Sequence, residues 1–535
     1  MGAMAYRRLR APQEQGEALV DPPLSEALAA LEANRHHALA WTFTCAGQAI
    51  GDLRRELRRE VLAAAASYVG EYAPSRSVDD ISPEAPLVVG GHQPQLYHPG
   101  VWFKNFLVDS LARRAGGVAL NLVVDNDLAR EAGIRVPTGT PEQARAEPVA
   151  YDRSLADVPW EERAIADRVL FDSFGGRVRD AVSGLVAEPL VTELWPSCVS
   201  AAKRNDNLGR ALAEGRHTLE MSWGLATWEL PLSRVCETNA FRRFVVHVLA
   251  NLPRFAAAYN GALEEYRAVH DLRSPAHPAP NLHAREGLLE APFWIWSQDA
   301  PQRRPLWVEW SAEQVALAGE SRITLPIGTP ERYERAVQVL TEASARGWRL
   351  RPRALMTTLF ARLFLADLFV HGIGGAKYDQ VTDVIMRKFF SVEPPRFVTA
   401  TATVRLPGLV SASGEADLRH VEQELRQLEY HPEMFLGSPS TAPLEAQKAW
   451  EQKRFWLGQT LPRGERAVRQ RGIVEANRRL AAFVAEPRRH LLSERERLEH
   501  QLPSQRILNS REHSFCLFPS PFLHDLLLAI SHSTR

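Results

Sequence analysis

The chain has 535 residues, of which 45% are hydrophobic and 24% are charged, and 64 basic residues balance 64 acidic ones. This length exceeds what one hydrophobic core usually holds, so we expect two or three domains. Because the balanced charge gives no overall basic field, we expect no nucleic-acid partner. No uncharged apolar run reaches the roughly 18 residues of a membrane span, so we expect no membrane partner either.

The cysteines are too far apart to suggest a shared site. They stand at Cys45, Cys198, Cys236 and Cys516, with no CxxC pair among them. This spacing predicts neither a zinc ribbon nor a disulfide framework. Together with an N-terminus that lacks a secretory signal pattern, it predicts a reducing, cytoplasmic location.

The first part of the chain predicts helices followed by a βαβ unit. Residues 5–80 are expected to form an N-terminal helical segment, because apolar residues within 24–75 recur at helical spacing. Residues 87–90 and 118–124 are apolar runs typical of buried strands, and Pro99 suits the first position of a helix between them. A strand, a helix and a second strand predict a parallel α/β core.

Polar residues follow the first predicted strand, where small or anionic ligands bind in open α/β folds. His92 and His98 are candidates to stabilise a phosphate or a developing negative charge. Lys104 lies near the positive end of the predicted helix and suits a phosphate or carboxylate. The alternative is that both histidines fill the loop and cap the helix while the lysine is solvated. Further candidates for binding substrate or nucleotide in this segment are Gly91, Gln93 and Asn105.

Two carboxylates follow the second predicted strand. Asp125 and Asp127 come directly after the apolar run 118–124. Carboxylates at this position commonly bind a ribose, an amine or a metal. Aspartate also favours turns because of its local hydrogen bonds, so a structural role remains the alternative.

A mixed α/β subdomain is expected at about 137–345, inserted into a core that spans 81–410. Within it, residues 241–266 are predicted to form one helix, and 291–296 and 305–310 are predicted to form a pair of strands. The tryptophans of these strands either stack on a base or sugar or, as the alternative, pack the subdomain.

A second strand, glycine-rich loop and helix follow. Residues 353–370 are predicted to form an apolar helix followed by a strand. Residues 372–380 are predicted to form the glycine-rich loop, and residues 381–390 are predicted to form the next helix. The spacing of a phosphate-binding P-loop is absent. The loop nevertheless offers close backbone approach and polar side chains, so the candidates for nucleotide or substrate binding here are Gly374, Gly375, Lys377, Tyr378 and Asp379.

The C-terminal part changes composition. Residues 411–505 are rich in Glu, Arg, Gln, Leu and Ala, and they predict an antiparallel helical arm. Residues 506–535 contain the apolar run 515–519 and are expected to pack on the core.

The order of these motifs resembles that of the bacillithiol-biosynthesis cysteine-adding enzymes, the BshC family. The likeness rests on residues 90–93, 125–127 and 372–375 and on Leu517-Phe518-Pro519. The His-Gln-Pro run that begins at His92 is also similar to that of WbqC-like proteins. His92 stands where the BshC family has Gln, and the acidic residue of its glycine loop is absent here.

The resemblance implies a Rossmann-like core related to class I nucleotidyltransferases and a coiled-coil arm that forms a homodimer. It also implies an enzyme that joins an amino acid or similar carboxylate to an amine. The expected cofactor is ATP or ADP together with Mg²⁺. The expected catalytic residues are His92, His98, Lys104, Asp125 and Asp127. The alternatives are a non-catalytic scaffold that keeps the fold, or a metal-dependent hydrolase that uses the two histidines and two aspartates.

Overall fold

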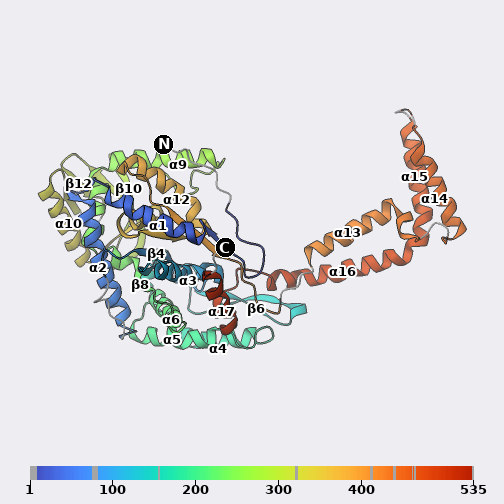
Figure 1. Cartoon of the computed structure of the whole chain (residues 1–535), viewed down its shortest axis with the longest axis horizontal. Helices are drawn as coiled ribbons and strands as arrows, with labels where there is room; N and C mark the ends of the chain where they lie inside the picture. The colour runs from blue at the N-terminus through green and yellow to red at the C-terminus, as the bar shows by residue number, and fades with distance from the viewer. Residues whose placement is uncertain are drawn as a thin grey trace. The chain divides into compact units, whose positions relative to one another are not determined.

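The computed structural model describes residues 9–74, 82–154, 157–319, 323–409, 414–437, 441–460, 462 and 465–532. Two compact units make up the chain (Figure 1). The first comprises Met1–Val136, Pro148–Arg405 and Arg511–Arg535, and the second comprises Pro137–Glu147 and Leu406–Ser510. All four cysteines are buried free thiols in the first unit.

A six-stranded sheet forms the centre of the first unit. Its neighbouring strands pair in parallel, except that the first strand runs antiparallel at one edge. This confirms the mostly parallel α/β sheet that the sequence predicts. In spatial order the strands are β1 (Ala18–Asp21), β16 (Phe397–Ala402), β15 (Leu368–His371), β4 (Leu87–His92), β5 (Val118–Val123) and β8 (Trp228–Pro231).

The predicted βαβ unit consists of β4, helix α3 (Pro99–Arg114) and β5. All six residues of β5 are buried, as expected for a parallel strand covered on both faces. Gly91 allows β4 to approach β5 closely, because a Cβ atom there would lie 2.8 Å from the backbone oxygen of Leu122. Pro99 occupies the first helical turn, where its missing N–H leaves no intrahelical bond unmade.

Two of the predicted helical stretches are interrupted. Helices α1 (Leu24–Leu39) and α2 (Ile50–Gly70) are separated by the hairpin of β2 (Thr44–Cys45) and β3 (Gln48–Ala49). The stretch predicted as one helix over 241–266 is α8 (Asn239–Ala250) and α9 (Leu252–Val269). The second break falls where Pro253 has no N–H to continue the helix.

A second, antiparallel sheet lies in the same unit. Its strands β10 (Leu288–Ser297) and β11 (Ala300–Trp310) pair with each other, which confirms the strand pair that the sequence predicts. The remaining strands are β9 (Ala284–Arg285), β12 (Gln314–Leu317), β13 (Ile323–Pro326) and β14 (Trp348–Pro352). The helices of this unit not yet named are α4 (Arg168–Val182), α5 (Val191–Arg204), α6 (Leu208–Ser222), α7 (Leu232–Val235), α10 (Pro330–Ala345), α11 (Ala354–Phe360) and α17 (Ser520–His532).

The glycine-rich segment differs from the prediction. Helix α12 runs from Ile373 to Ile385, so the expected loop over 372–380 is wrong and only Gly372 precedes the helix. A side chain in place of Gly375 would clash with His371, because a Cβ atom there would lie only 2.8 Å from Nδ1 of that histidine. This glycine therefore makes room for a histidine of the preceding strand.

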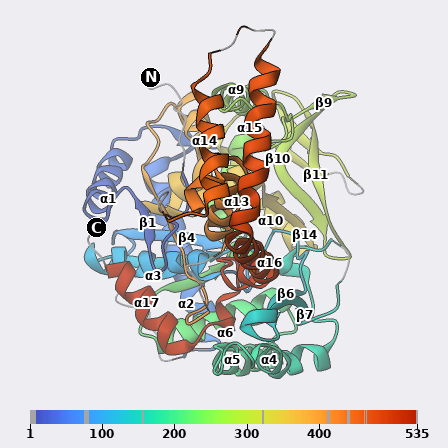
Figure 2. The ribbon, with the colours of Figure 1, turned by 90° about the vertical axis from the view of Figure 1, so that its right-hand side faces the viewer.

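In the described residues of the second unit, the α-helices are α13 (Glu415–Tyr430), α14 (Leu444–Gly458), α15 (Arg466–Ala481) and α16 (Ala485–Leu508). Helix α13 pairs with α16, and α14 pairs with α15 (Figure 2). Residues 137–147 belong to this unit because Ser504 of α16 donates a hydrogen bond to the backbone oxygen of Glu142 at 2.9 Å. No helix in the described ranges combines the length and the apolar character of a membrane span.

Candidate functional site

Strands β4, β5 and β8 are parallel neighbours, so their carboxyl ends meet at one edge of the sheet. His92 ends β4, and Asp125 and Asp127 follow β5. Gln93 connects the two strand ends, because its side-chain amide donates to Oδ2 of Asp127 at 3.0 Å. The structure thus brings together residues predicted from two separate segments.

The His92 ring has an acceptor at each nitrogen. Nδ1 lies 3.1 Å from the backbone oxygen of Gln93, and Nε2 lies 3.1 Å from Oδ1 of Asn105. The Asn105 amide nitrogen donates to Glu220 at 2.6 Å, which leaves its oxygen facing the ring. The Tyr97 hydroxyl also lies 2.9 Å from Nε2. The two acceptors fit a ring that is protonated on both nitrogens, whereas a neutral ring that carries its proton on Nδ1 would accept from the Tyr97 hydroxyl at Nε2.

The electrostatic surroundings oppose that charge. Burial, Lys104 and Arg216 together hold the pKa of His92 well below its usual value. These surroundings therefore favour the neutral ring, although Gln93 and Asn105 can accept hydrogen bonds from a charged one. An anion beside it would favour the protonated form and raise the pKa.

A buried charge network lies behind His92. Arg216 of α6 donates to Glu220 at 2.7 Å and also pairs with Glu229 of β8. Asn121 of β5 donates to the same Glu229 at 2.7 Å. These side chains are almost fully buried, so they fix Asn105, and through it His92, in one orientation.

Lys104 is a buried cation in the second turn of α3. Its side chain is only 6% exposed, and its Nζ donates to the backbone oxygen of Gly91 at 3.0 Å. Across the described ranges, no carboxylate lies within ion-pair distance of this Nζ. Burial lowers the pKa of Lys104 to about 8. A Cβ atom at Gly372 would lie 4.0 Å from its Cδ, so the lysine reaches toward the start of α12.

The two predicted aspartates already have partners in the chain. Asp125 accepts hydrogen bonds from the backbone N–H and the hydroxyl of Ser233, and burial raises the pKa of its carboxyl group. Asp127 accepts from Gln93 and from Arg303, the latter at 3.1 Å. These contacts orient both carboxylates within the chain, and their part in binding a ribose, an amine or a metal stays a prediction.

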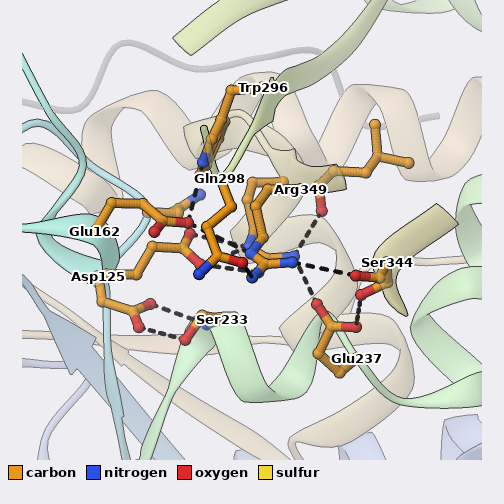
Figure 3. Close-up of polar contacts among 12 residues, drawn as sticks. Asp125, Glu162, Ser233, Glu237, Trp296, Gln298, Ser344 and Arg349 are labelled. Carbon is orange, nitrogen blue, oxygen red and sulfur yellow. Dashed lines mark hydrogen bonds and ion pairs between the residues drawn. The ribbon is translucent and has the colours of Figure 1, made fainter. Parts of the chain in front are cut away.

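Beside Asp125 lies a cluster that the sequence does not predict (Figure 3). The backbone N–H of Glu161 donates to the backbone oxygen of Asp125 at 2.8 Å. Arg351 of β14 forms a two-point ion pair with Glu161, with bonds of 2.9 and 2.8 Å, and also donates to Glu237 at 3.1 Å. Burial raises the pKa of Glu161 to about 7. No local pattern links these residues, because Glu161 and Arg351 are 190 positions apart.

The cluster continues to the second sheet. Arg349 of β14 pairs with Glu162 at 3.3 Å and donates to the side chain of Gln298 at 3.3 Å. The indole N–H of Trp296 also donates to Glu162, at 3.3 Å (Figure 3). These contacts connect the sheet-edge site to the tryptophan-rich strands.

Other predicted site residues have structural partners. His98 caps α3, because its Nδ1 accepts from the backbone N–H of Gly100 at 3.1 Å. Asp379 is buried between Arg362 and His371, and these two residues hold the pKa of its carboxyl group below the usual value. His98 therefore has the capping role that was its alternative, and the part of His98 and Asp379 in binding or catalysis stays a prediction.

The remaining candidates lie in the first turns of α12. Gly374 has open space where a Cβ atom would stand, and Tyr378 contacts the ring of His277, with ring centres 5.5 Å apart. Lys377 lies between them in the same helix. Their part in ligand binding stays a prediction.

Within the described ranges, no group of three or more His, Cys, Asp or Glu side chains could hold a metal ion. The hydrolase hypothesis therefore lacks the ligand set it proposed. No protein-family model matches the chain, and no curated protein matches it in sequence.

Proposed function

We propose that the protein is a ligase-like enzyme that joins an amino acid, or a similar carboxylate, to an amine, with a nucleotide held at the carboxyl edge of the sheet. The observation that carries this proposal is the buried ammonium group of Lys104. A buried cation without a carboxylate partner is unfavourable unless a ligand supplies the opposite charge. The complementary ligand group is a phosphate or a carboxylate.

The surroundings of Lys104 support an anionic ligand. Its ammonium group lies at the end of β4, and its side chain approaches Gly372 at the start of α12. Helix N-termini and lysines both favour anions. His92, with acceptors at both ring nitrogens, would gain the second proton when an anion binds nearby and would then stabilise it.

Amide formation from a carboxylate requires activation, for which we propose ATP as co-substrate. The carboxylate oxygen attacks the α-phosphorus of ATP, the bond to pyrophosphate breaks, and an acyl adenylate forms. The amine nitrogen then attacks the acyl carbon, the C–O bond to AMP breaks, and one proton leaves the nitrogen. Lys104 and His92 stabilise the negative charge on the phosphate and on the leaving AMP.

Glu161 is the candidate acceptor for the amine proton. Its pKa of about 7 is suited to general-base catalysis near neutral pH. It lies beside Asp125, whose carboxyl pKa is also raised by burial. Because the pKa values of Glu161 and Asp125 are both raised, we propose that this pair of carboxyl groups accepts the proton that the amine releases.

The experiment is ATP–pyrophosphate exchange with labelled pyrophosphate, run separately with each of the twenty amino acids. We expect label to enter ATP with one or a few amino acids. Lys104→Met should reduce the exchange about a hundredfold, in line with the loss of one charged transition-state contact. The control is Lys388→Met, because Lys388 is a half-exposed lysine that pairs with Glu265 at 3.3 Å.

Two results would contradict the proposal. Exchange that Lys104→Met leaves unchanged would show that the lysine does not bind the nucleotide. Absence of exchange with every amino acid, together with no calorimetric binding of ATP, would favour the non-catalytic scaffold instead.

A further inference from the structure

The second sheet contains a pocket of about 440 Å³ that the proposed function does not use. Strands β10, β11 and β14 supply most of its lining. Its volume falls within the range of about 300–1,000 Å³ that is usual for small-molecule sites. All of its lining residues belong to the first unit.

Aromatic rings dominate the lining. Trp296 is buried, whereas Trp307 and Trp348 are half-buried and present part of their rings to the pocket. Leu288 and Ile295 add apolar surface. Flat apolar walls of this kind bind planar rings by stacking and by burial of apolar area.

Among the residues that the structure describes, the charged lining residues are Arg285 and Arg304, and both are cationic. In the part of the chain that the structure describes, the side chain of neither arginine takes part in an ion pair or a hydrogen bond. The Arg285 guanidinium lies over the Trp307 ring, 4.0 Å from its centre, so this cation is held at the aromatic wall.

We propose that this pocket binds a planar aromatic molecule that carries a carboxylate or phosphate group. The ring packs against the aromatic wall formed by Trp307 and Trp348, and the anionic group pairs with Arg304 and with Arg285, which lies over the Trp307 ring. The inference is independent of the proposed function, because none of the pocket residues belongs to the anion site around Lys104.

The pocket also adjoins the sheet-edge cluster. Trp296 lines the pocket and donates its indole N–H to Glu162, which pairs with Arg349 (Figure 3). A ligand that moves the Trp296 ring would therefore alter the partners of Glu162.

The test is isothermal titration calorimetry with two matched pairs of probes: 2-naphthoate against 2-naphthalenemethanol, and AMP against adenosine. We expect the anionic member of at least one pair to bind about tenfold or more tightly than the neutral member, as one charge-assisted contact provides. Tighter binding of AMP than of naphthoate, if it persists in the Lys104→Met variant, identifies a nucleotide as the ligand of the pocket, and the reverse order identifies a small aromatic acid.

Substitutions locate the binding. The double variant Arg285→Gln, Arg304→Gln should remove the preference for the anion, and Trp307→Leu should weaken both members of the pair. The control Arg335→Gln changes an exposed arginine of α10 that pairs with Glu342 at 3.0 Å, and it should have no effect. Thermal unfolding of each variant verifies folding.

Two outcomes would overturn the inference. One is no binding of any of the four probes. The other is binding that the arginine pair and Trp307 do not influence. Lys104→Met separates this site from the sheet edge, because loss of AMP binding in that variant would place AMP at the edge, whereas unchanged binding would keep it in the pocket.

Discussion

Replacing Lys104 by methionine should stabilise the protein at neutral pH. Burial lowers the pKa of this lysine from 10.5 to about 8, so the folded state releases a proton that the unfolded chain retains between those pH values. The stability of the wild type therefore rises as pH increases from 8 to 10.5. A shift of this size corresponds to about 3 kcal/mol of unfavourable free energy at pH 7. Methionine carries no charge and fills a similar space, so it removes this cost.

The assay is urea unfolding of the wild type and Lys104→Met at pH 7 and at pH 10. The variant should be more stable by about 2–3 kcal/mol at pH 7, once the lost hydrogen bond to Gly91 is allowed for, and the difference should shrink at pH 10. Lys388→Met is the matched control and should show no such dependence on pH. A variant that is less stable than the wild type at pH 7, or a difference that is equal at both pH values, would refute the reasoning.

Three further substitutions test the buried polar groups by urea unfolding. Asn105→Leu leaves Glu220 without one of its buried donors and should destabilise the protein by about 2–3 kcal/mol. Arg362→Met leaves the buried carboxylate of Asp379 without its cationic partner and should destabilise it by about 3–5 kcal/mol at pH 7. Burial raises the pKa of Glu161 to about 7, so wild-type stability falls as pH rises from 4.5 to 7. Glu161→Gln should lack this loss of stability, and equal slopes in the two proteins would contradict the assignment.

The βαβ unit was predictable because its signals are local. Apolar runs at 87–90 and 118–124 and the proline at the start of α3 identify two strands and a helix without reference to distant residues. Parallel pairing then places the strand ends at one edge, which is how His92 and Asp125 could both be assigned to it. The cluster around Arg351 was not predictable, because its partners come from widely separated segments.

Glycines misled the sequence interpretation at α12. Gly374 and Gly375 suggested a loop for close approach of a ligand, since glycine weakens helices. The structure places both in the first turn of the helix, and Gly375 accommodates the ring of His371. Glycine is needed at position 375 so that α12 can pack closely against His371 at the end of β15. This packing requirement outweighs the low helix propensity of glycine, and it cannot be seen in a single sequence.

The buried charges of this fold differ in whether another charged group of the chain neutralises them. Arg362 has Asp379 as its buried counter-ion, and Arg216 has Glu220, so these charges are neutralised within the chain. Lys104 is buried to the same degree, yet its one hydrogen-bond partner in the described part of the chain is a neutral carbonyl oxygen. An unpaired buried charge lowers stability, and stability alone would favour its replacement by an apolar residue. If the proposed anion binds at Lys104, the Lys104→Met variant should be more stable than the wild type and should also lose binding of that anion.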